Sequence, residues 1–298
     1  MLNSKANTTD IPSQCGEARW DTMWLAIDAF ILVTGGVANV ALLWLFLRER
    51  KSLSASQVLG LNLVVMDLIF LTEMPINMIY PPKGNVNRTQ PEALWVTTPK
   101  HPLDLTSEVF SMLNLVGCPL LLACMCAERC LAVVRPVLYL RVRRWEYRMA
   151  VSAVVWVFTC CFCLATGLVR NVVAIMQVVS IIIVFLFCLM LLCLGAVIWS
   201  LQKPSPALQP GSGSPLKRRA LDSVLLVVLL AVVAYLPVMV FVPMVFYFQN
   251  TAFDGVFCII FELMFLTPVF GVFIGPLFYL SKARQMCCLG KTGKTVNQ

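Results

Sequence analysis

The chain has 298 residues, of which 59% are hydrophobic and only 13% are charged, and its formal net charge is +8. A soluble domain usually carries about 25% charged residues, so this composition would leave large apolar patches in contact with water. It excludes an ordinary cytosolic enzyme, a disordered protein and a nucleic-acid binder. The single histidine disfavours a histidine-based metal or acid–base site, and the sequence predicts no enzyme activity, metal or cofactor.

A helix that crosses a bilayer needs about 20 mostly apolar residues. The sequence contains seven such runs, at residues 23–46, 58–80, 105–134, 149–168, 172–201, 220–248 and 256–280. They do not alternate in polarity as the strands of a membrane β-barrel do, and helices satisfy their backbone hydrogen bonds internally. The predicted fold is an all-α membrane protein, a seven-transmembrane helix bundle.

The lysines and arginines give the bundle a direction. One set of connections carries 17 of them and the other carries six, and the richer set is expected in the cytosol. This places an N-terminal tail, residues 1–22, outside, a seven-helix domain at 23–280, and a cytoplasmic tail at 281–298. The first 20 residues lack a basic start and an apolar core, so we expect no cleaved signal peptide. Asn7 and Asn87 begin glycosylation sequons on the predicted outer side.

The third span ends in a charged pair, Glu128 and Arg129, and Pro136 follows in the next connection. An arginine at the cytosolic end of a helix can pair with the adjacent acid at rest and be released on activation. The alternative is an arginine that only contributes to the positive charge of the cytosolic face.

The second, sixth and seventh spans carry further polar residues and prolines. Asp67 lies inside the second span, where an acid needs a partner or a proton, and Asn39 of the first span is its expected neighbour. Pro237 removes a helix hydrogen bond and forms either a pivot or a static kink in the sixth span. The seventh span ends in Pro276 and Tyr279.

Together these motifs resemble the rhodopsin-like (class A) G-protein-coupled receptors, nearest the purinergic and protease-activated branch, along all seven spans. The family reads Cys-Trp-Leu-Pro where this chain reads Ala-Tyr-Leu-Pro, and Asn-Pro-x-x-Tyr where it reads Gly-Pro-Leu-Phe-Tyr; Pro75 and Trp156 also match family positions. The resemblance implies a plasma-membrane receptor whose partners are an extracellular ligand, membrane lipid and a heterotrimeric G protein. The coupling and switch residues that it implies are Glu128, Arg129, Pro136, Tyr235, Pro237, Pro276 and Tyr279.

The chain departs from the family pattern at several switch positions. Gly275 replaces the family's asparagine, and Cys118 stands where a serine often lines a sodium pocket beside Asp67, which disfavours a sodium-stabilised resting state. The fifth span has neither the usual proline nor the usual tyrosine. An alternative function is a seven-helix decoy or scavenger that binds its ligand without signalling. It is favoured by the missing fifth-span switches, by Cys130 and Gly275 at replaced family positions, and by the loss of the family's outer disulfide.

The usual outer disulfide of the family cannot form, because Asp104 stands at the third-span position and the short loop around Arg170 has no cysteine. The resemblance to the branch implies instead a disulfide between Cys15 and Cys258. A short interfacial helix after the seventh span would carry Cys287 and Cys288 as palmitoylation sites, the alternative being two free cytosolic thiols.

Acidic residues are unusually frequent in the predicted outer halves of the spans. Asp28, Glu73, Glu108 and Glu262 lie in the first, second, third and seventh spans, and the one basic residue near them is Arg170 at the rim. Carboxylates buried together need protons or a counter-charge, which a cationic ligand would supply. Alternatively, these acids face water or pair with Arg170, Lys100 and Arg19. The candidate ligand-pocket residues are therefore Asp28, Glu73, Glu108, Glu262 and Arg170.

Overall fold

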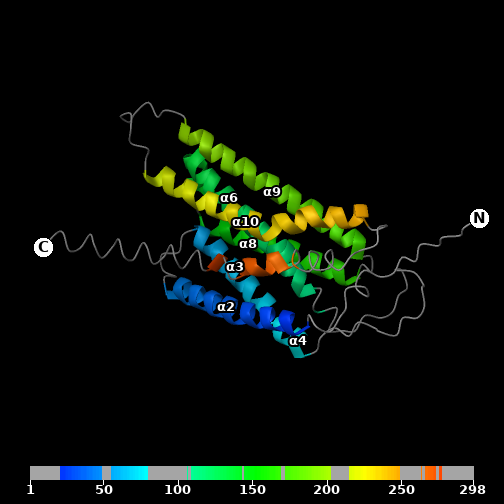
Figure 1. Ribbon diagram of the computed structural model, residues 1–298. Coiled ribbons are helices and arrows are strands. Elements are labelled where there is room, and N and C mark those ends of the chain that lie inside the picture. The colour runs from blue at the N-terminus through cyan, green and yellow to red at the C-terminus, as the bar shows by residue number, and fades with distance from the viewer. Residues whose placement is uncertain are drawn as a thin grey trace, which may run out of the picture.

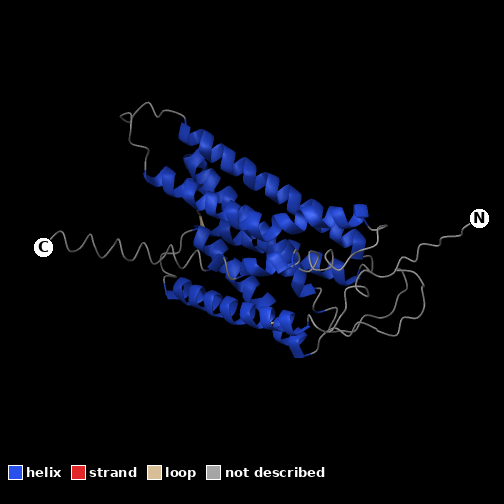
Figure 2. Ribbon diagram, in the orientation of Figure 1, coloured by secondary structure: helices blue, strands red, loops and turns tan. Residues whose placement is uncertain are grey.

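The computed structural model describes residues 21–48, 55–79, 106, 109–142, 144–168, 172–202, 215–248, 263, 266–272 and 275–276. These residues are almost entirely helical, and no β-strand occurs among them (Figure 2). The long helices lie side by side as a bundle (Figure 1). This agrees with the all-α prediction.

The first two predicted spans form three helices. They are α2 (Asp21–Arg48), α3 (Ala55–Leu71) and α4 (Met74–Ile79). The second span is broken at Thr72 and Glu73, where backbone bonds of a turn replace the α-helical pattern. Pro75 follows the break, in the first turn of α4, where its missing N–H costs no helix bond.

The third span is helical from Val109 but changes its register at η2 (Leu113–Gly117), a π-helical turn, before it continues as α6 (Cys118–Val134). Arg135 leaves the helical conformation, as expected of a residue that precedes a proline. The chain then forms α7 (Pro136–Val142), so the connection expected after the third span is helical here.

The next three spans are α8 (Trp145–Leu168), α9 (Val172–Gln202) and α10 (Pro215–Phe248). The start of α9 agrees with the sequence prediction, whereas α8 and α10 begin earlier than their apolar runs because polar residues extend them beyond the hydrocarbon. Five of the described helical segments are long and apolar enough to cross a membrane, and a sixth, Val224–Val238 of α10, is shorter.

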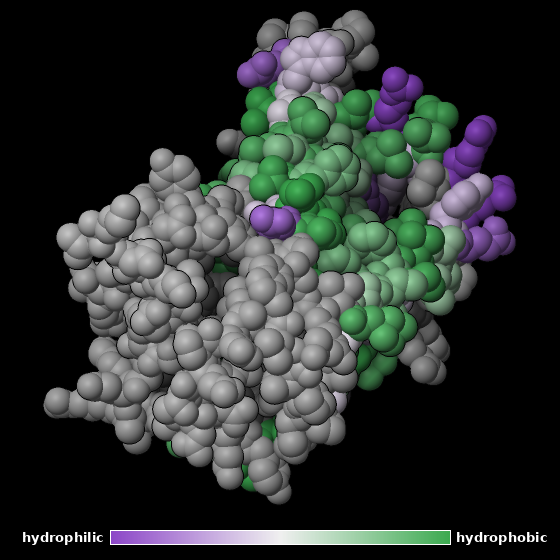
Figure 3. Space-filling view, turned by 90° about the vertical axis from the view of Figure 1, so that its right-hand side faces the viewer, coloured by the Kyte–Doolittle hydropathy of each residue, from purple (hydrophilic) through white to green (hydrophobic). Residues whose placement is uncertain are grey.

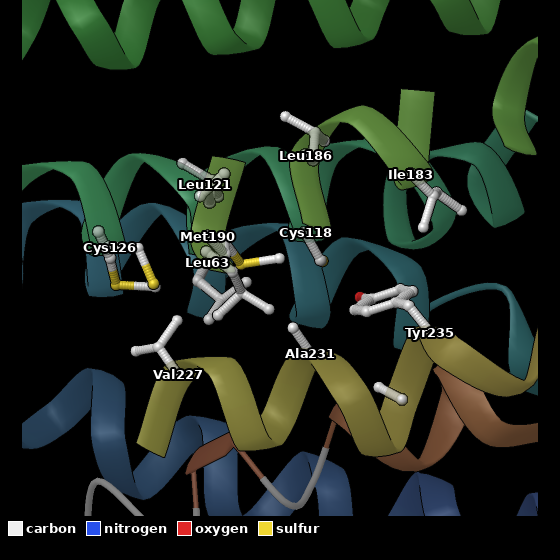
Figure 4. Close-up of a cluster of buried hydrophobic side chains, with 14 of the residues drawn as sticks. Leu63, Cys118, Leu121, Cys126, Ile183, Leu186, Met190, Val227, Ala231 and Tyr235 are labelled. Atoms are coloured by element: carbon white, nitrogen blue, oxygen red, sulfur yellow. The ribbon is translucent and has the colours of Figure 1, made fainter. Parts of the chain in front are cut away.

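The third span lies at the centre of the bundle, where α6 packs against α3, α9 and α10. Figure 4 shows part of this core, in which Leu121 of α6, Leu63 of α3 and Leu186 of α9 belong to one buried cluster. A second cluster brings Leu266 and Val272 of the seventh span against α2 and α3. The described part of the seventh span therefore lies beside the first and second spans.

The outer surface of the bundle is apolar. Val37 on α2 and Leu192 on α9 are 68% and 71% exposed, and many other large apolar side chains are also exposed. Figure 3 shows apolar side chains over much of the described surface, with hydrophilic ones mainly toward its edges. Such a surface is costly in water and matches the hydrocarbon of a bilayer.

Candidate functional site

A polar cluster lies inside the bundle where the second, third and sixth spans meet. The Cys118 thiol donates a hydrogen bond to the Asp67 carboxylate over 3.3 Å. The Tyr235 hydroxyl lies 3.3 Å from both the backbone oxygen and the side-chain oxygen of Asn114, and it also contacts the Cys118 thiol. Figure 4 shows the Tyr235 ring extending from α10 toward the third span. All four side chains are buried.

A cavity of about 20 Å³ adjoins this cluster, and Gly271 and Gly275 of the seventh span line it together with Asp67, Asn114, Cys118 and Tyr235. About 10–15 Å³ accommodates one water molecule, whereas pockets for drug-sized ligands start near 300 Å³. The cavity can therefore hold water but not an organic ligand. The two glycines contribute no side-chain oxygen to this cavity, and the Cys118 thiol is a poor ligand for a hard cation. The expected loss of a sodium-stabilised state stays a prediction.

Asn39 is fully buried, but its bonds differ from those we expected. Its side-chain amide donates to the backbone oxygens of Gly35, at 2.9 Å, and Val272, at 2.8 Å. No hydrogen bond joins Asn39 to Asp67 among the described residues, and Cys118 is the partner of that acid. Asn39 thus joins the first span to the seventh.

A second, partly buried network joins the second and fourth spans. Trp156 donates from its indole N–H to the Asn62 side-chain oxygen at 2.9 Å, and the Asn62 amide donates to the Ser152 hydroxyl at 3.1 Å. These bonds fix the position of α8 against α3, since a polar group left unpaired in hydrocarbon is costly.

Four residues, three of them charged, meet at the predicted cytosolic end of the third span. The Tyr139 hydroxyl of α7 donates to the Glu128 carboxylate at 3.3 Å. The cationic side chains of Arg129 and Arg148 interact electrostatically with the same carboxylate. Glu128 and Arg129 are both half-buried, so α7 and α8 contribute to the environment of this acid–arginine pair.

Two of the acids expected in the ligand pocket are described. Asp28 lies half-buried on α2, and Glu73 is buried at the break between α3 and α4. Since α2 packs against α4, these two acids belong to neighbouring elements at one end of the bundle.

The predicted switch prolines occupy three different settings. Pro136 is exposed at the start of α7, Pro237 is half-buried within the continuous helix α10, and Pro276 is buried in the seventh span. The remaining predicted site residues lie outside the described ones: Glu108, Glu262, Arg170, Tyr279, Asn7, Asn87, Cys15, Cys258, Cys287 and Cys288.

Sequence reasoning missed two polar residues, Asn114 of the Asp67 cluster and Asn62 of the network with Trp156. A signal was present for both, because a polar residue within an apolar span is expensive and often functional. Pro119 in the middle of the third span was a second overlooked signal, since proline disturbs a helix interior.

Comparisons with known proteins agree with this geometry. Residues 38–279 match the 7 transmembrane receptor (rhodopsin family). Among curated proteins, a purinoceptor of Mus musculus is 27% identical over 56% of this chain and 46% of its own. The uracil nucleotide/cysteinyl leukotriene receptor of Homo sapiens is 31% identical over 48% of this chain and 37% of its own.

Lysophosphatidic acid receptor 5 of Mus musculus is 27% identical over 57% of this chain and 44% of its own. The chain thus spans less than half the length of these relatives. The rhodopsin-family match, by contrast, covers most of the chain and includes the Asp67 cluster, the Glu128–Arg129 pair and both prolines Pro237 and Pro276. The chain therefore belongs to the rhodopsin family of seven-transmembrane receptors, which are not enzymes.

Proposed function

We propose that the protein is a plasma-membrane receptor that transmits the binding of an extracellular ligand to a cytosolic heterotrimeric G protein. The observation that carries this proposal is the Glu128–Arg129 pair at one end of the central helix α6, half-buried and bonded to α7 through Tyr139. Movement of α10 about Pro237 would open a cleft beside Arg129. The basic residues of the connections would attract anionic lipid and an acidic partner surface.

Glu128→Gln is expected to raise agonist-independent nucleotide exchange on the G protein. The substitution removes the negative charge that holds Arg129, while it preserves the side-chain shape. Losing an interaction of about 1 kcal/mol shifts a two-state equilibrium about fivefold. The measurement is GTP-analogue binding by purified G protein with the receptor in lipid nanodiscs. Glu146→Gln, an exposed acid in the first turn of α8, is the control and should match wild type.

The ligand that we propose is cationic. Asp28 and Glu73 lie on neighbouring elements at the predicted outer end, and neither α2 nor α3–α4 carries a lysine or arginine there. Relatives are named for a uracil nucleotide, a cysteinyl leukotriene and lysophosphatidic acid, all of which are anionic. Recognition of an anion requires basic groups, so the acids of this chain favour a different ligand charge.

A paired compound screen tests this ligand class, with amines and their uncharged N-acetyl derivatives compared for thermal stabilisation of the purified receptor. The expected result is stabilisation by some amines, loss of the effect on acetylation, and a weaker effect for Glu73→Gln. The control is Asp222→Asn. Asp222 is an exposed acid near the start of α10, at the predicted cytosolic end of the bundle and away from Asp28 and Glu73. Stabilisation by uridine diphosphate or lysophosphatidic acid, with none by any amine, would overturn the cationic proposal.

A second candidate function is a decoy that binds its ligand without activating a G protein. It is favoured by α9, whose residues Val172–Gln202 include neither proline nor tyrosine. Ligand binding without nucleotide exchange for any G-protein subtype would support the decoy.

The remaining sequence predictions belong to the same proposal. The organisation stays a tail at 1–22, a helical domain at 23–280 and a second tail at 281–298, although α2 begins at Asp21. Glycosylation at Asn7 and Asn87, a Cys15–Cys258 disulfide, and palmitoylation at Cys287 and Cys288 are each testable by mass spectrometry of non-reduced peptides.

A further inference from the structure

The register change in the third span deprives the Asn114 backbone oxygen of its usual helix donor. In η2 the Cys118 N–H bonds to the Leu113 oxygen, five residues back, so it is not aimed at Asn114 as an α-helix would require. The next donor in the π-helical register would be residue 119, but this residue is proline and has no N–H. The Asn114 oxygen therefore lacks both possible intrahelical donors.

Tyr235 of α10 takes the place of the missing donor. Its hydroxyl lies 3.3 Å from the Asn114 backbone oxygen and 3.3 Å from the Asn114 side-chain oxygen. Both distances are long for a hydroxyl donor, so the bond is weak and can break without a large cost. The Asn114 amide also lies 3.5 Å from the Pro268 oxygen of the seventh span, which places one residue between the third, sixth and seventh spans.

The π-helical turn cannot shift easily toward a regular helix. All five of its residues are buried. A Cβ atom built on Gly117 would lie 2.8 Å from the Met66 sulfur of α3 and 3.0 Å from a Thr159 methyl of α8, so the backbone touches both neighbouring helices. Packing against α3 and α8 therefore holds the Asn114 oxygen in place, and Pro119 leaves it without a π-helical donor.

We propose that Pro119 is a positioning residue that keeps the Asn114 oxygen available to Tyr235, and that this bond holds α10 against the third span in the resting receptor. The proposal rests on the proposed receptor function and deepens it. In this proposal, a proline of the third span controls the resting position of α10, and no residue of the fifth span is needed for that role. When the hydroxyl leaves Asn114, α10 can move about Pro237, two residues further along the helix.

The test compares wild type, Pro119→Ala, Tyr235→Phe and the double variant in lipid nanodiscs. Pro119→Ala restores an N–H that competes with the tyrosine for the carbonyl, and Tyr235→Phe removes the hydroxyl. The first readout is hydrogen exchange of the α10 amides by mass spectrometry, and the second is agonist-independent nucleotide exchange on the G protein. Pro75→Ala, a membrane proline in α4 outside this cluster, is the matched control.

Each single variant is expected to raise both exchange rates about two- to tenfold, the shift that one hydrogen bond produces. The double variant should not exceed the larger single effect, because both substitutions remove the same bond. Pro119→Val restores the same N–H and keeps a side chain of similar volume, so it should give the same result as Pro119→Ala. It takes the place of the alanine variant if that variant does not fold.

Additive effects, or wild-type hydrogen exchange in either Tyr235→Phe or the folded Pro119 variants, would overturn the proposal. A different outcome is the expected hydrogen-exchange pattern together with no nucleotide exchange in wild type or any variant. That result would support the bond but contradict the proposed signalling function. The two failures are therefore distinguishable.

Discussion

Gly117→Leu is expected to prevent stable assembly of the bundle, whereas Gly36→Leu leaves it intact. Gly117 lies at the point where the third span touches both α3 and α8, and even a single Cβ there would come within 2.8 Å of the Met66 sulfur. Met66 is fully buried, so its side chain cannot swing into solvent to relieve this contact. Overpacking of a core costs about 1–3 kcal/mol for modest insertions, and a leucine inserts four carbons.

Gly36 provides the matched control within the same bundle. A Cβ built on it meets no atom within 4 Å, because this part of α2 faces outward. Both substitutions replace a helical glycine by a good helix former, which by itself is favourable, so a difference between them reports packing alone. The measurement is the thermal unfolding midpoint of the purified receptors. Equal midpoints for the two variants would contradict the close contact of η2 with α3 and α8.

Arg129→Ala is expected to abolish activation of the G protein. The arginine lies half-buried at the end of the central helix α6, beside a carboxylate that also interacts with Arg148 and Tyr139. If release of this arginine provides the main contact with the G protein, its removal costs about 2 kcal/mol or more, as for an interface hot spot. That loss corresponds to about a 30-fold or greater decrease in nucleotide exchange.

The control for this experiment is Arg141→Ala, an exposed arginine in the last turn of α7. It has the same charge and lies on the same predicted face, so it separates the role of one guanidinium from the general attraction of a basic surface. A decrease of about fivefold or less is expected for Arg141→Ala at moderate salt. Similar decreases for both variants would show that Arg129 contributes only positive charge, the alternative that the sequence leaves open.

The apolar runs predicted the helices well because hydrocarbon thickness imposes a length on every span. The run from residue 172 begins where α9 begins, and the all-α fold is confirmed by the rhodopsin-family match. The break at Thr72–Glu73 and the π-helical turn at Leu113–Gly117 do not alter hydropathy, so composition cannot reveal them. Pro75 and Pro119 are the residues in the sequence that signal these two irregularities, and the sequence prediction included only Pro75.

Pairing of buried polar groups was predicted less well. The buried position of Asp67 followed from its place within an apolar span, but its partner is Cys118 rather than Asn39. Partners depend on how each helix is rotated about its axis, and spans that are apolar on nearly all faces give little periodicity from which to read that rotation. The Tyr235–Asn114 contact was hidden for the same reason.

Nucleotide exchange by the wild-type receptor is the most direct test of the proposed function. The receptor in lipid nanodiscs is incubated with purified heterotrimeric G proteins of each subtype, with and without a compound that stabilises it thermally. We expect exchange by at least one subtype to rise above that with empty nanodiscs, to rise further with the compound, and to return to the empty level in Arg129→Ala. Thermal stabilisation by the compound without exchange on any subtype would contradict the receptor function and support the decoy.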